Sequence, residues 1–192
     1  GDTAVFSGRF PSGCREYSLW RTVMEPERFT FGVFKPLWSD LGGSISGEVR
    51  SGTAPEDEDT FSQHESIPLA EVVRNINKFS NNVMTRQVFL TIGVDAAGTP
   101  GTPEKSRAAI DAWMKEWGLA GAGLYLDNGS GLSRETRINA RGLGQMLLQA
   151  WQHPLMPEII SSLAVSGTDG TLRNRFRGTS LAGRMHIKTG RL

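Results

Sequence analysis

Two short tripeptides in the sequence carry side chains that could transfer protons and bind a carboxylate. They are Ser80–Asn82, between two apolar helical runs, and Lys188–Gly190, at the end of an alternating segment. A serine hydroxyl next to a cation can relay a proton, and the amide of Asn82 can hold a substrate amide by hydrogen bonds. The lysine adds a positive charge that attracts a carboxylate and favours deprotonated neighbours. Thr189 offers a hydroxyl to that carboxylate, and Gly190 leaves room for a ligand beside the strand.

Several other kinds of site have no support in the sequence. The three histidines lie far apart, and neither an HExxH pattern nor a cysteine pair is present, which argues against a zinc site. No P-loop and no glycine-rich dinucleotide motif occurs after a strand-like segment. Ser130 lies between glycines, but Asn128 and Leu132 occupy the positions where an esterase elbow has glycine. We therefore expect neither a metal nor an organic cofactor.

The two tripeptides require a helix corner and a strand to position them. An apolar stripe with spacings of three and four residues predicts a helix from about Pro68 to Phe79. Ser and Asn compete with helical hydrogen bonds and favour caps, so residues 80–82 are predicted to form the corner before a second helix. Apolar and polar residues alternate over 185–188, which predicts a strand leading into the second tripeptide.

Composition indicates a globular protein without an electrostatic attraction to nucleic acid. The 192 residues have 38% hydrophobic and 21% charged side chains, and 21 basic against 20 acidic residues give a net charge of +1. No apolar run approaches the roughly 18 residues that span a bilayer. Cys14 is the single cysteine, so no disulfide can form within the chain.

The amino-terminal third reads differently from the rest. Residues 1–22 favour short strands, residues 27–42 a helix, and residues 45–49 a further strand. Residues 51–66 are polar, acidic and rich in turn formers, which is typical of a linker. We therefore predict a domain boundary in that segment.

Three further blocks reveal a family resemblance. The sequence NINKFSNNVM at 75–84 resembles the second-motif helix of the class C, DacB-like penicillin-binding proteins. The sequence DNGSGLSR at 127–134 is similar to that family's usual DGSGLSR, and SGTDGTL at 166–172 is similar to its next glycine-rich loop. The order of these blocks and of the Lys-Thr-Gly motif matches the family. The resemblance covers residues 28–192 and is strongest from Leu69 onward.

This resemblance implies a multi-domain α+β fold. Residues 67–192 would be part of a β-lactamase/transpeptidase-like domain, formed by its helical region and the Lys-Thr-Gly strand. Residues 1–66 would be the carboxyl-terminal part of an inserted, β-rich domain. The resemblance also implies roles for individual side chains: catalysis for Ser80, Asn82 and Lys188, and substrate binding for Thr189, Gly190 and Arg134.

The function implied is that of a serine-type D-Ala-D-Ala carboxypeptidase/endopeptidase. Such an enzyme cleaves peptidoglycan stem peptides through an acyl-enzyme, and β-lactams acylate the same serine. The family's Ser-x-x-Lys motif does not occur in this chain. We expect it upstream of Gly1, and we expect the 192-residue polypeptide alone to be inactive. Two other functions stay open, a serine β-lactamase and a non-catalytic peptidoglycan-binding module, although the 127–134 block favours the peptidase.

The resemblance also implies location and partners. The expected site of action is the periplasm, and the expected partners are peptidoglycan peptides and β-lactam antibiotics, with peripheral association with membrane or murein. Nothing in the pattern specifies an oligomeric state. His186 shares the predicted strand face of Lys188, so it is either a substrate contact or a residue of the strand surface.

Overall fold

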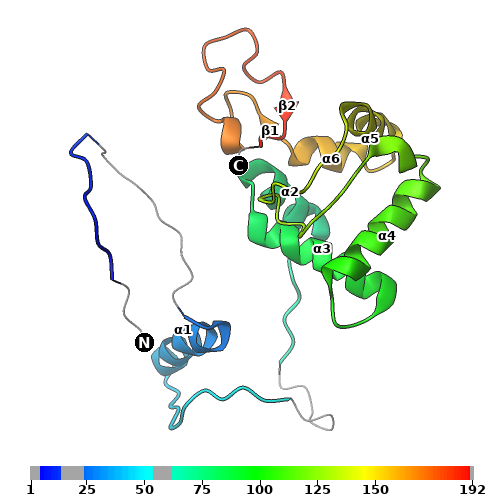
Figure 1. Ribbon diagram of the computed structural model, residues 1–192. Helices are drawn as coiled ribbons and strands as arrows, with labels where there is room; N and C mark the ends of the chain where they lie inside the picture. Colours follow the sequence, from blue (N-terminus) through cyan, green and yellow to red (C-terminus); the bar gives the residue numbers. More distant parts are fainter. Residues whose placement is uncertain (1–4, 14–23, 54–61, 191–192) are drawn as a thin grey trace. The chain divides into compact units, whose positions relative to one another are not determined.

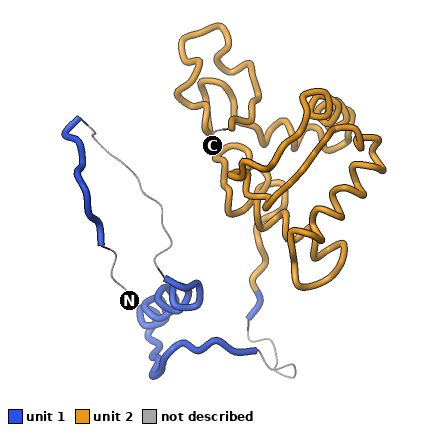
Figure 2. Tube along the Cα trace, viewed as in Figure 1, with its two compact units in different colours: residues 1–63 blue, residues 64–192 orange. Residues whose placement is uncertain are grey.

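The computed structural model describes residues 5–13, 24–53 and 62–190. The chain divides into two compact units, residues 1–63 and residues 64–192 (Figure 2). The division lies within the segment 51–66 that we interpreted as a linker. The assignment of the two parts to an inserted domain and a catalytic domain stays a prediction.

The first unit contains one helix, α1 (Pro26–Asp40), in its described part. Proline at the first helical position suits the start of α1, because its missing N–H would have no partner there. The helix ends at Asp40, shortly before Gly42, which has φ 88°. It confirms the helix predicted over 27–42. The rings of Phe34 and Trp38, one turn apart, stack with centroids 5.8 Å apart.

The strands predicted in this unit are wrong where the structure describes them. Residues 5–13 and 45–49 form no strand, while residues 1–4 and 14–22, including Cys14, lie outside the described residues. Strand-forming side chains alone do not make a strand, because its backbone N–H and C=O groups must pair with a neighbouring segment.

The second unit consists of helices with a small two-stranded sheet at one end (Figure 1). Its elements in chain order are α2 (Leu69–Phe79), α3 (Asn82–Ala97), α4 (Pro103–Glu116), η1 (Ala120–Ala122), α5 (Ala140–Gln152), α6 (Met156–Ser162), β1 (Ala164–Val165), η2 (Gly170–Leu172) and β2 (His186–Ile187). This combination confirms the predicted α+β fold class. No helix in the described parts of the chain has the length and apolar character needed to cross a bilayer.

Close helix contacts hold the predicted corner in place. α2 and α3 are joined at residues 80 and 81, as predicted, and α3 packs along α4. A Cβ atom on Gly93 of α3 would lie 2.6 Å from Ser106 Oγ of α4, so glycine permits this close approach. On its other side α2 packs against α6, which leads directly into β1.

A buried cluster at the opposite end of the unit stabilises α4 and α5. Met114, Leu119 and Ala122 are buried there, and the half-buried side chains packed against them are Ile110, Trp117, Leu124, Ile138 and Met146. Gly142 of α5 touches the backbone of Ala122 so closely that a Cβ atom would lie 2.3 Å from its Cα. The helical scaffold is therefore anchored away from the two motifs, which lie at its α2–β2 end.

The sheet supplies the strand predicted at the end of the chain. β1 and β2 are antiparallel, with Ala164 opposite Ile187 and Val165 opposite His186. Within 185–188 the apolar residues are half-buried and the polar ones exposed, which confirms the predicted alternation. β2 is only two residues long, and the Lys-Thr-Gly segment follows it directly.

Candidate active site

The serine of the corner and the lysine of the terminal segment meet in space. Although 108 positions separate them, Lys188 Nζ donates a hydrogen bond to Ser80 Oγ at 2.8 Å. The same ammonium donates to the carbonyl oxygen of Thr189 at 2.8 Å. The structure thus places a hydroxyl and an ammonium group from distant parts of the chain within hydrogen-bond distance.

The local sequence explains why the corner presents this hydroxyl. Ser80 ends α2 with φ 55° and ψ 49°, in the left-handed region that non-glycine residues rarely adopt. Asn81 then caps α3, because its side-chain oxygen accepts a hydrogen bond from the Met84 N–H at 3.0 Å. Backbone conformations of this kind cluster at functional sites.

Asn82 is held by the loop that contains the DNGSGLSR block. Its Nδ2 donates to the carbonyl oxygen of Ser130 at 2.7 Å. That loop is itself ordered: Asn128 Oδ1 accepts hydrogen bonds from the N–H and the hydroxyl of Ser130 at 3.0 and 2.7 Å. Arg107 of α4 also donates to the carbonyl oxygen of Asp127 at 2.6 Å. The block therefore orients the Asn82 amide, and the hydroxyl of Ser130 is already engaged.

A cavity of about 570 Å³ opens between these elements. Its lining includes five of the six predicted site residues, namely Ser80, Asn82, Lys188, Thr189 and Gly190. The other lining residues are Ile76, Asn77, Thr85, Ser130, Gly131, Leu132, Thr171 and Arg175. Arg134, the sixth predicted residue, is exposed and does not line this cavity.

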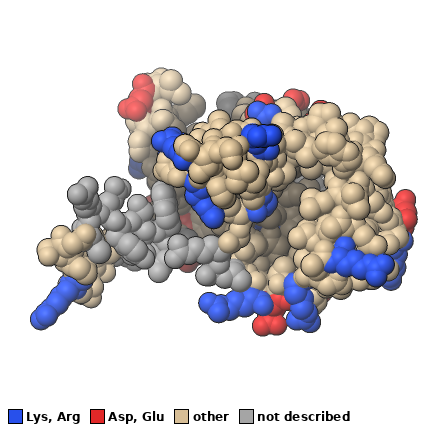
Figure 3. Space-filling view, turned by 90° about the horizontal axis from the view of Figure 1, so that it is seen from above, with Lys and Arg blue, Asp and Glu red and all other residues tan. Residues whose placement is uncertain are grey.

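The charges that line this cavity are all positive. Lys188 and Arg175 contribute cations, and none of the lining residues is acidic. Lys188 is exposed as a whole residue, but desolvation around its amine lowers the pKa of Lys188 below the ordinary lysine value. Segment 173–188 has the basic residues Arg173, Arg175, Arg177, Arg184 and Lys188 and no acidic one. In the space-filling view, Lys and Arg side chains form several clusters on the face shown (Figure 3). The basic lining of the cavity suits an anionic ligand.

Sequence reasoning missed five polar lining residues, namely Asn77, Thr85, Ser130, Thr171 and Arg175. Thr171 lies beside the terminal motif, with its Oγ1 2.9 Å from Thr189 Oγ1. Ser130 and Thr171 both belong to blocks that carry the family resemblance, and Arg175 belongs to a run of alternating arginines. Those patterns singled out the segments but not the side chains that face the cavity.

The role of His186 was left open by the sequence, whereas no metal site was expected. The His186 ring is directed toward α6, where its Nδ1 lies 3.0 Å from the carbonyl oxygen of Ile160, and it does not line the cavity. Within residues 5–13, 24–53 and 62–190, no cluster of three His, Cys, Asp or Glu side chains could hold a metal ion.

Comparison with known proteins gives concordant matches. The profile of the D-Ala-D-Ala carboxypeptidase 3 (S13) family matches residues 1–192. A D-alanyl-D-alanine carboxypeptidase from an Actinomadura species is 32% identical over 98% of this chain and 36% of its own length. Carboxypeptidase DacB of Mycolicibacterium smegmatis is 30% identical over 75% of this chain and 31% of its own length. The chain thus spans about a third of the length of these curated relatives.

Solved structures show the same fold. Penicillin binding protein 4 (dacB) from Haemophilus influenzae, complexed with a β-lactam, superposes with a TM-score of 0.75 at 20% identity. The match covers 93% of this chain and 42% of that one. A second structure of the same protein gives a TM-score of 0.76 over 88% of this chain and 38% of that one. These similarities agree with the predicted transpeptidase-like fold.

Proposed function

The chain belongs to the D-Ala-D-Ala carboxypeptidase 3 (S13) family, and on this premise we propose that the full-length protein is a serine D-Ala-D-Ala peptidase. Its substrates are peptidoglycan stem peptides, and its site of action is the periplasm. The observation that carries the proposal is the 2.8 Å contact between Lys188 Nζ and Ser80 Oγ, inside a cavity that Asn82 and Thr189 also line.

The reaction proceeds through an acyl-enzyme. A serine from a Ser-x-x-Lys motif outside this chain attacks the carbonyl carbon of the penultimate D-Ala. The C–N bond breaks, the serine oxygen retains the acyl group as an ester, and the amine of the terminal D-Ala leaves with a proton passed on by Ser80. Water then attacks the ester carbonyl, the bond to the serine oxygen breaks, the shortened peptide leaves with a free carboxylate, and the serine oxygen regains a proton. A β-lactam acylates the same serine, because its ring amide opens in the equivalent step.

The other side chains bind and orient the substrate. Because Asn82 Nδ2 is held by Ser130, its Oδ1 remains to accept a hydrogen bond from a substrate N–H. The positive charge of Lys188 lies beside the Ser80 hydroxyl. This charge favours the deprotonated form of Ser80 while its proton is transferred. The Thr189 hydroxyl donates to the substrate carboxylate, and Gly190 lets the peptide lie along the strand. No metal or organic cofactor takes part in these steps.

Covalent labelling with a fluorescent penicillin tests this function. The full-length protein should label, and the modified serine, located by mass spectrometry, should lie outside residues 1–192. The 192-residue chain alone should stay unlabelled, since it has no Ser-x-x-Lys motif. A label on the short chain contradicts the missing nucleophile, and an unlabelled full-length protein with an intact motif contradicts the peptidase. Rapid loss of the label would point instead to a β-lactamase.

Arg175→Gln should weaken binding of peptides that end in a free carboxylate. Arg175 lines the cavity with Lys188, and a hydrogen bond to a charged group contributes about 1.5–3 kcal/mol. Because Arg175 is exposed, we expect the low end of this range, a rise in KM of about 10-fold with little change in kcat. Steady-state kinetics with a D-Ala-D-Ala peptide and with its carboxamide measure the effect. The carboxamide should lose this dependence on Arg175.

The matched control for this substitution is Arg134→Gln. Arg134 is exposed and lies off the cavity lining, so its loss should leave the ratio of the KM values for the carboxylate peptide and its carboxamide unchanged. If Arg134→Gln changes that ratio and Arg175→Gln does not, Arg175 has no role in binding the carboxylate. Because the family resemblance assigns Arg134 to the stem side chain, its effect should instead depend on the residue at that position of the peptide.

A further inference from the structure

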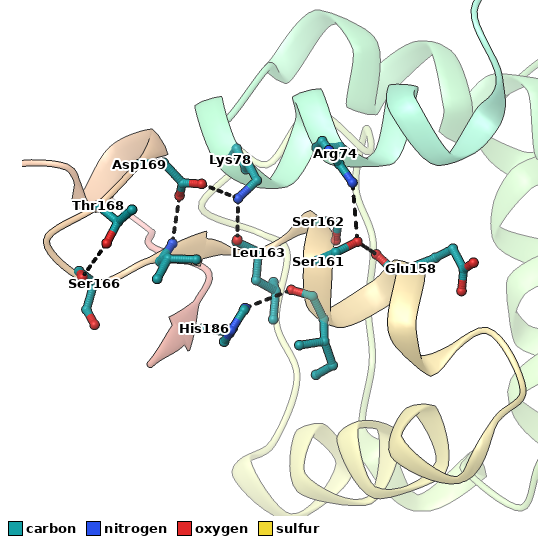
Figure 4. Close-up of polar contacts among 12 residues, drawn as sticks. Arg74, Lys78, Glu158, Ser161, Ser162, Leu163, Ser166, Thr168, Asp169 and His186 are labelled. Atoms are coloured by element: carbon teal, nitrogen blue, oxygen red, sulfur yellow. Dashed lines mark hydrogen bonds and ion pairs between the residues drawn. The ribbon is translucent and has the colours of Figure 1, made fainter. Parts of the chain in front are cut away.

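A lysine with little solvent exposure lies two positions before Ser80, on the last turn of α2. The Lys78 side chain is 12% exposed, and its Nζ forms an ion pair with Asp169 Oδ2 at 2.5 Å. The same ammonium donates to the carbonyl oxygen of Leu163 at 3.0 Å (Figure 4). A lysine ammonium is almost never placed this deeply without partners, and these two partners both belong to the segment around β1.

Both oxygens of Asp169 are engaged. Oδ1 accepts a hydrogen bond from the N–H of Val165 in β1 at 2.8 Å, while Oδ2 receives Lys78. Desolvation acts to raise the pKa of Asp169, but the Lys78 and Val165 hydrogen bonds and the charges of Lys78 and His186 outweigh it, so this pKa is lowered. The carboxylate is therefore ionised, and it accepts one hydrogen bond from β1 and one from α2.

Two further contacts seat the end of α2 on this segment. A Cβ atom on Gly170, which has φ 55°, would lie 2.4 Å from the carbonyl oxygen of Lys78, so the loop meets the helix backbone directly. Asn77 Nδ2 also donates to Ser162 Oγ at 2.8 Å. The last turn of α2 therefore has a defined place against residues 162–170.

The same segment positions the terminal motif. β1 pairs with β2, and the Ser166 N–H donates to the carbonyl oxygen of Met185 at 3.0 Å. Lys188 follows β2 directly. A continuous path of contacts thus runs from Ser80 through Lys78 and Asp169 to β1, and from β1 across the sheet to Lys188.

We infer that Lys78 and Asp169 form a positioning pair that holds the Ser80 hydroxyl within reach of the Lys188 amine. Neither residue lines the cavity, so neither touches the substrate. The Asp169 side chain is 38% exposed, so the ion pair itself adds little net stability. Its hydrogen bonds nevertheless restrict how the last turn of α2 can lie against β1. The inference rests on the proposed function, because it assigns these residues to the geometry of that site.

Breaking the pair should slow acylation in the full-length protein. Misplacing reacting groups by an ångström can cost about 100-fold in rate, so Lys78→Met should lower the second-order rate constant for penicillin acylation by that order. Asp169→Asn should do the same, although its side-chain oxygen can still accept the Val165 N–H. Lys78→Arg, which keeps the cation, should recover most of the rate. The double variant Lys78→Met/Asp169→Asn should be no slower than either single variant, because both remove one interaction.

Lys105→Met is the matched control. Lys105 also anchors backbone carbonyls, those of Gly98 and Pro100 at 2.7 and 3.0 Å, but it lies on α4 and does not line the cavity. Its loss should leave the acylation rate constant unchanged. If Lys105→Met slows acylation as much as Lys78→Met at an equal loss of Tm, the effect is general destabilisation and the positioning inference is wrong.

A second readout separates this inference from the proposed function. The pH dependence of Lys188 acetylation, followed by peptide mass spectrometry, reports the pKa of its amine without any need for acylation. In Lys78→Met this pKa should rise toward the ordinary lysine value, because the amine loses its desolvated position. An unchanged pKa of Lys188 in a folded Lys78→Met protein overturns the positioning pair. If penicillin does not acylate the wild-type protein, only the peptidase proposal is overturned. The pKa measurement on Lys188 would still test the positioning pair.

Discussion

Ser80→Ala in the full-length protein is expected to lower the rate constant for penicillin acylation by about 10²- to 10⁴-fold, the usual contribution of a positioned proton-transfer group. The Ser80 hydroxyl is the polar group that Lys188 contacts at 2.8 Å, and alanine leaves no atom to carry the proton to the departing amine. Stopped-flow acylation measures the effect. The affinity of the initial complex should change little, because the hydroxyl acts chiefly in the chemical step.

Two further substitutions separate the hydroxyl from the backbone. Ser80 has φ 55°, where alanine and serine are both disfavoured but glycine is not. Ser80→Gly should therefore be as slow as Ser80→Ala, yet at least as stable to heat as the wild type. Ser161→Ala removes the hydroxyl of a half-buried residue on α6 that does not line the cavity, and it should keep wild-type rates. Wild-type acylation by Ser80→Gly would show that the hydroxyl has no part in proton transfer.

Lys188→Met is expected to lower the acylation rate constant by about 10²- to 10³-fold, comparable with the loss of one preorganised electrostatic donor in other active sites. Unlike most losses of a functional group, it should also raise Tm near neutral pH. Desolvation lowers the pKa of Lys188 in the folded protein, so the unfolded chain binds this proton more tightly than the folded one. The charged amine therefore destabilises the fold, and methionine removes that cost while keeping most of the side-chain volume.

The sign of the pH dependence follows from the same linkage. The cost of Lys188 is complete at pH values below its folded-state pKa and vanishes above the unfolded-state value, which is ordinarily 10.5. The Tm advantage of Lys188→Met over the wild type should thus shrink as pH rises toward that value. Calorimetry across this range measures the difference. Lys115→Met, at an exposed site in the last turn of α4, should show no gain in Tm, and a similar gain there would argue against a cost specific to Lys188.

The corner and the terminal motif were predictable because their geometry is encoded over a few neighbouring residues. Apolar spacing in α2, cap-forming Ser80 and Asn81, and alternation over 185–188 act through local backbone preferences. The strand predicted at 45–49 failed for the converse reason. Its side chains suit a strand, but a strand forms only with a partner, and the described residues provide none there.

Side chains that depend on distant partners were beyond sequence reasoning. Lys78 and Asp169 are 91 positions apart, and no local pattern indicates that they form an ion pair. Sequence patterns could not identify Arg175 and Thr171 as lining residues among their neighbours. The packing of a loop decides which of its residues face a cavity. Arg134 illustrates the reverse case: the block that contains it was recognised, but the structure leaves this side chain exposed and off the cavity lining.

The amino-acid sequence alone shows which chemical groups are present, their order along the chain, the helix corner at Ser80 and the family to which the chain belongs. Three features depend on the folded chain: Ser80 contacts Lys188, the lining of their cavity is basic without any acidic side chain, and Lys78 pairs with Asp169. The difference comes from the range over which each interaction acts. Backbone preferences act over a few residues, whereas the distance between positions 80 and 188 results from the packing of α2 on α6 and the pairing of β1 with β2.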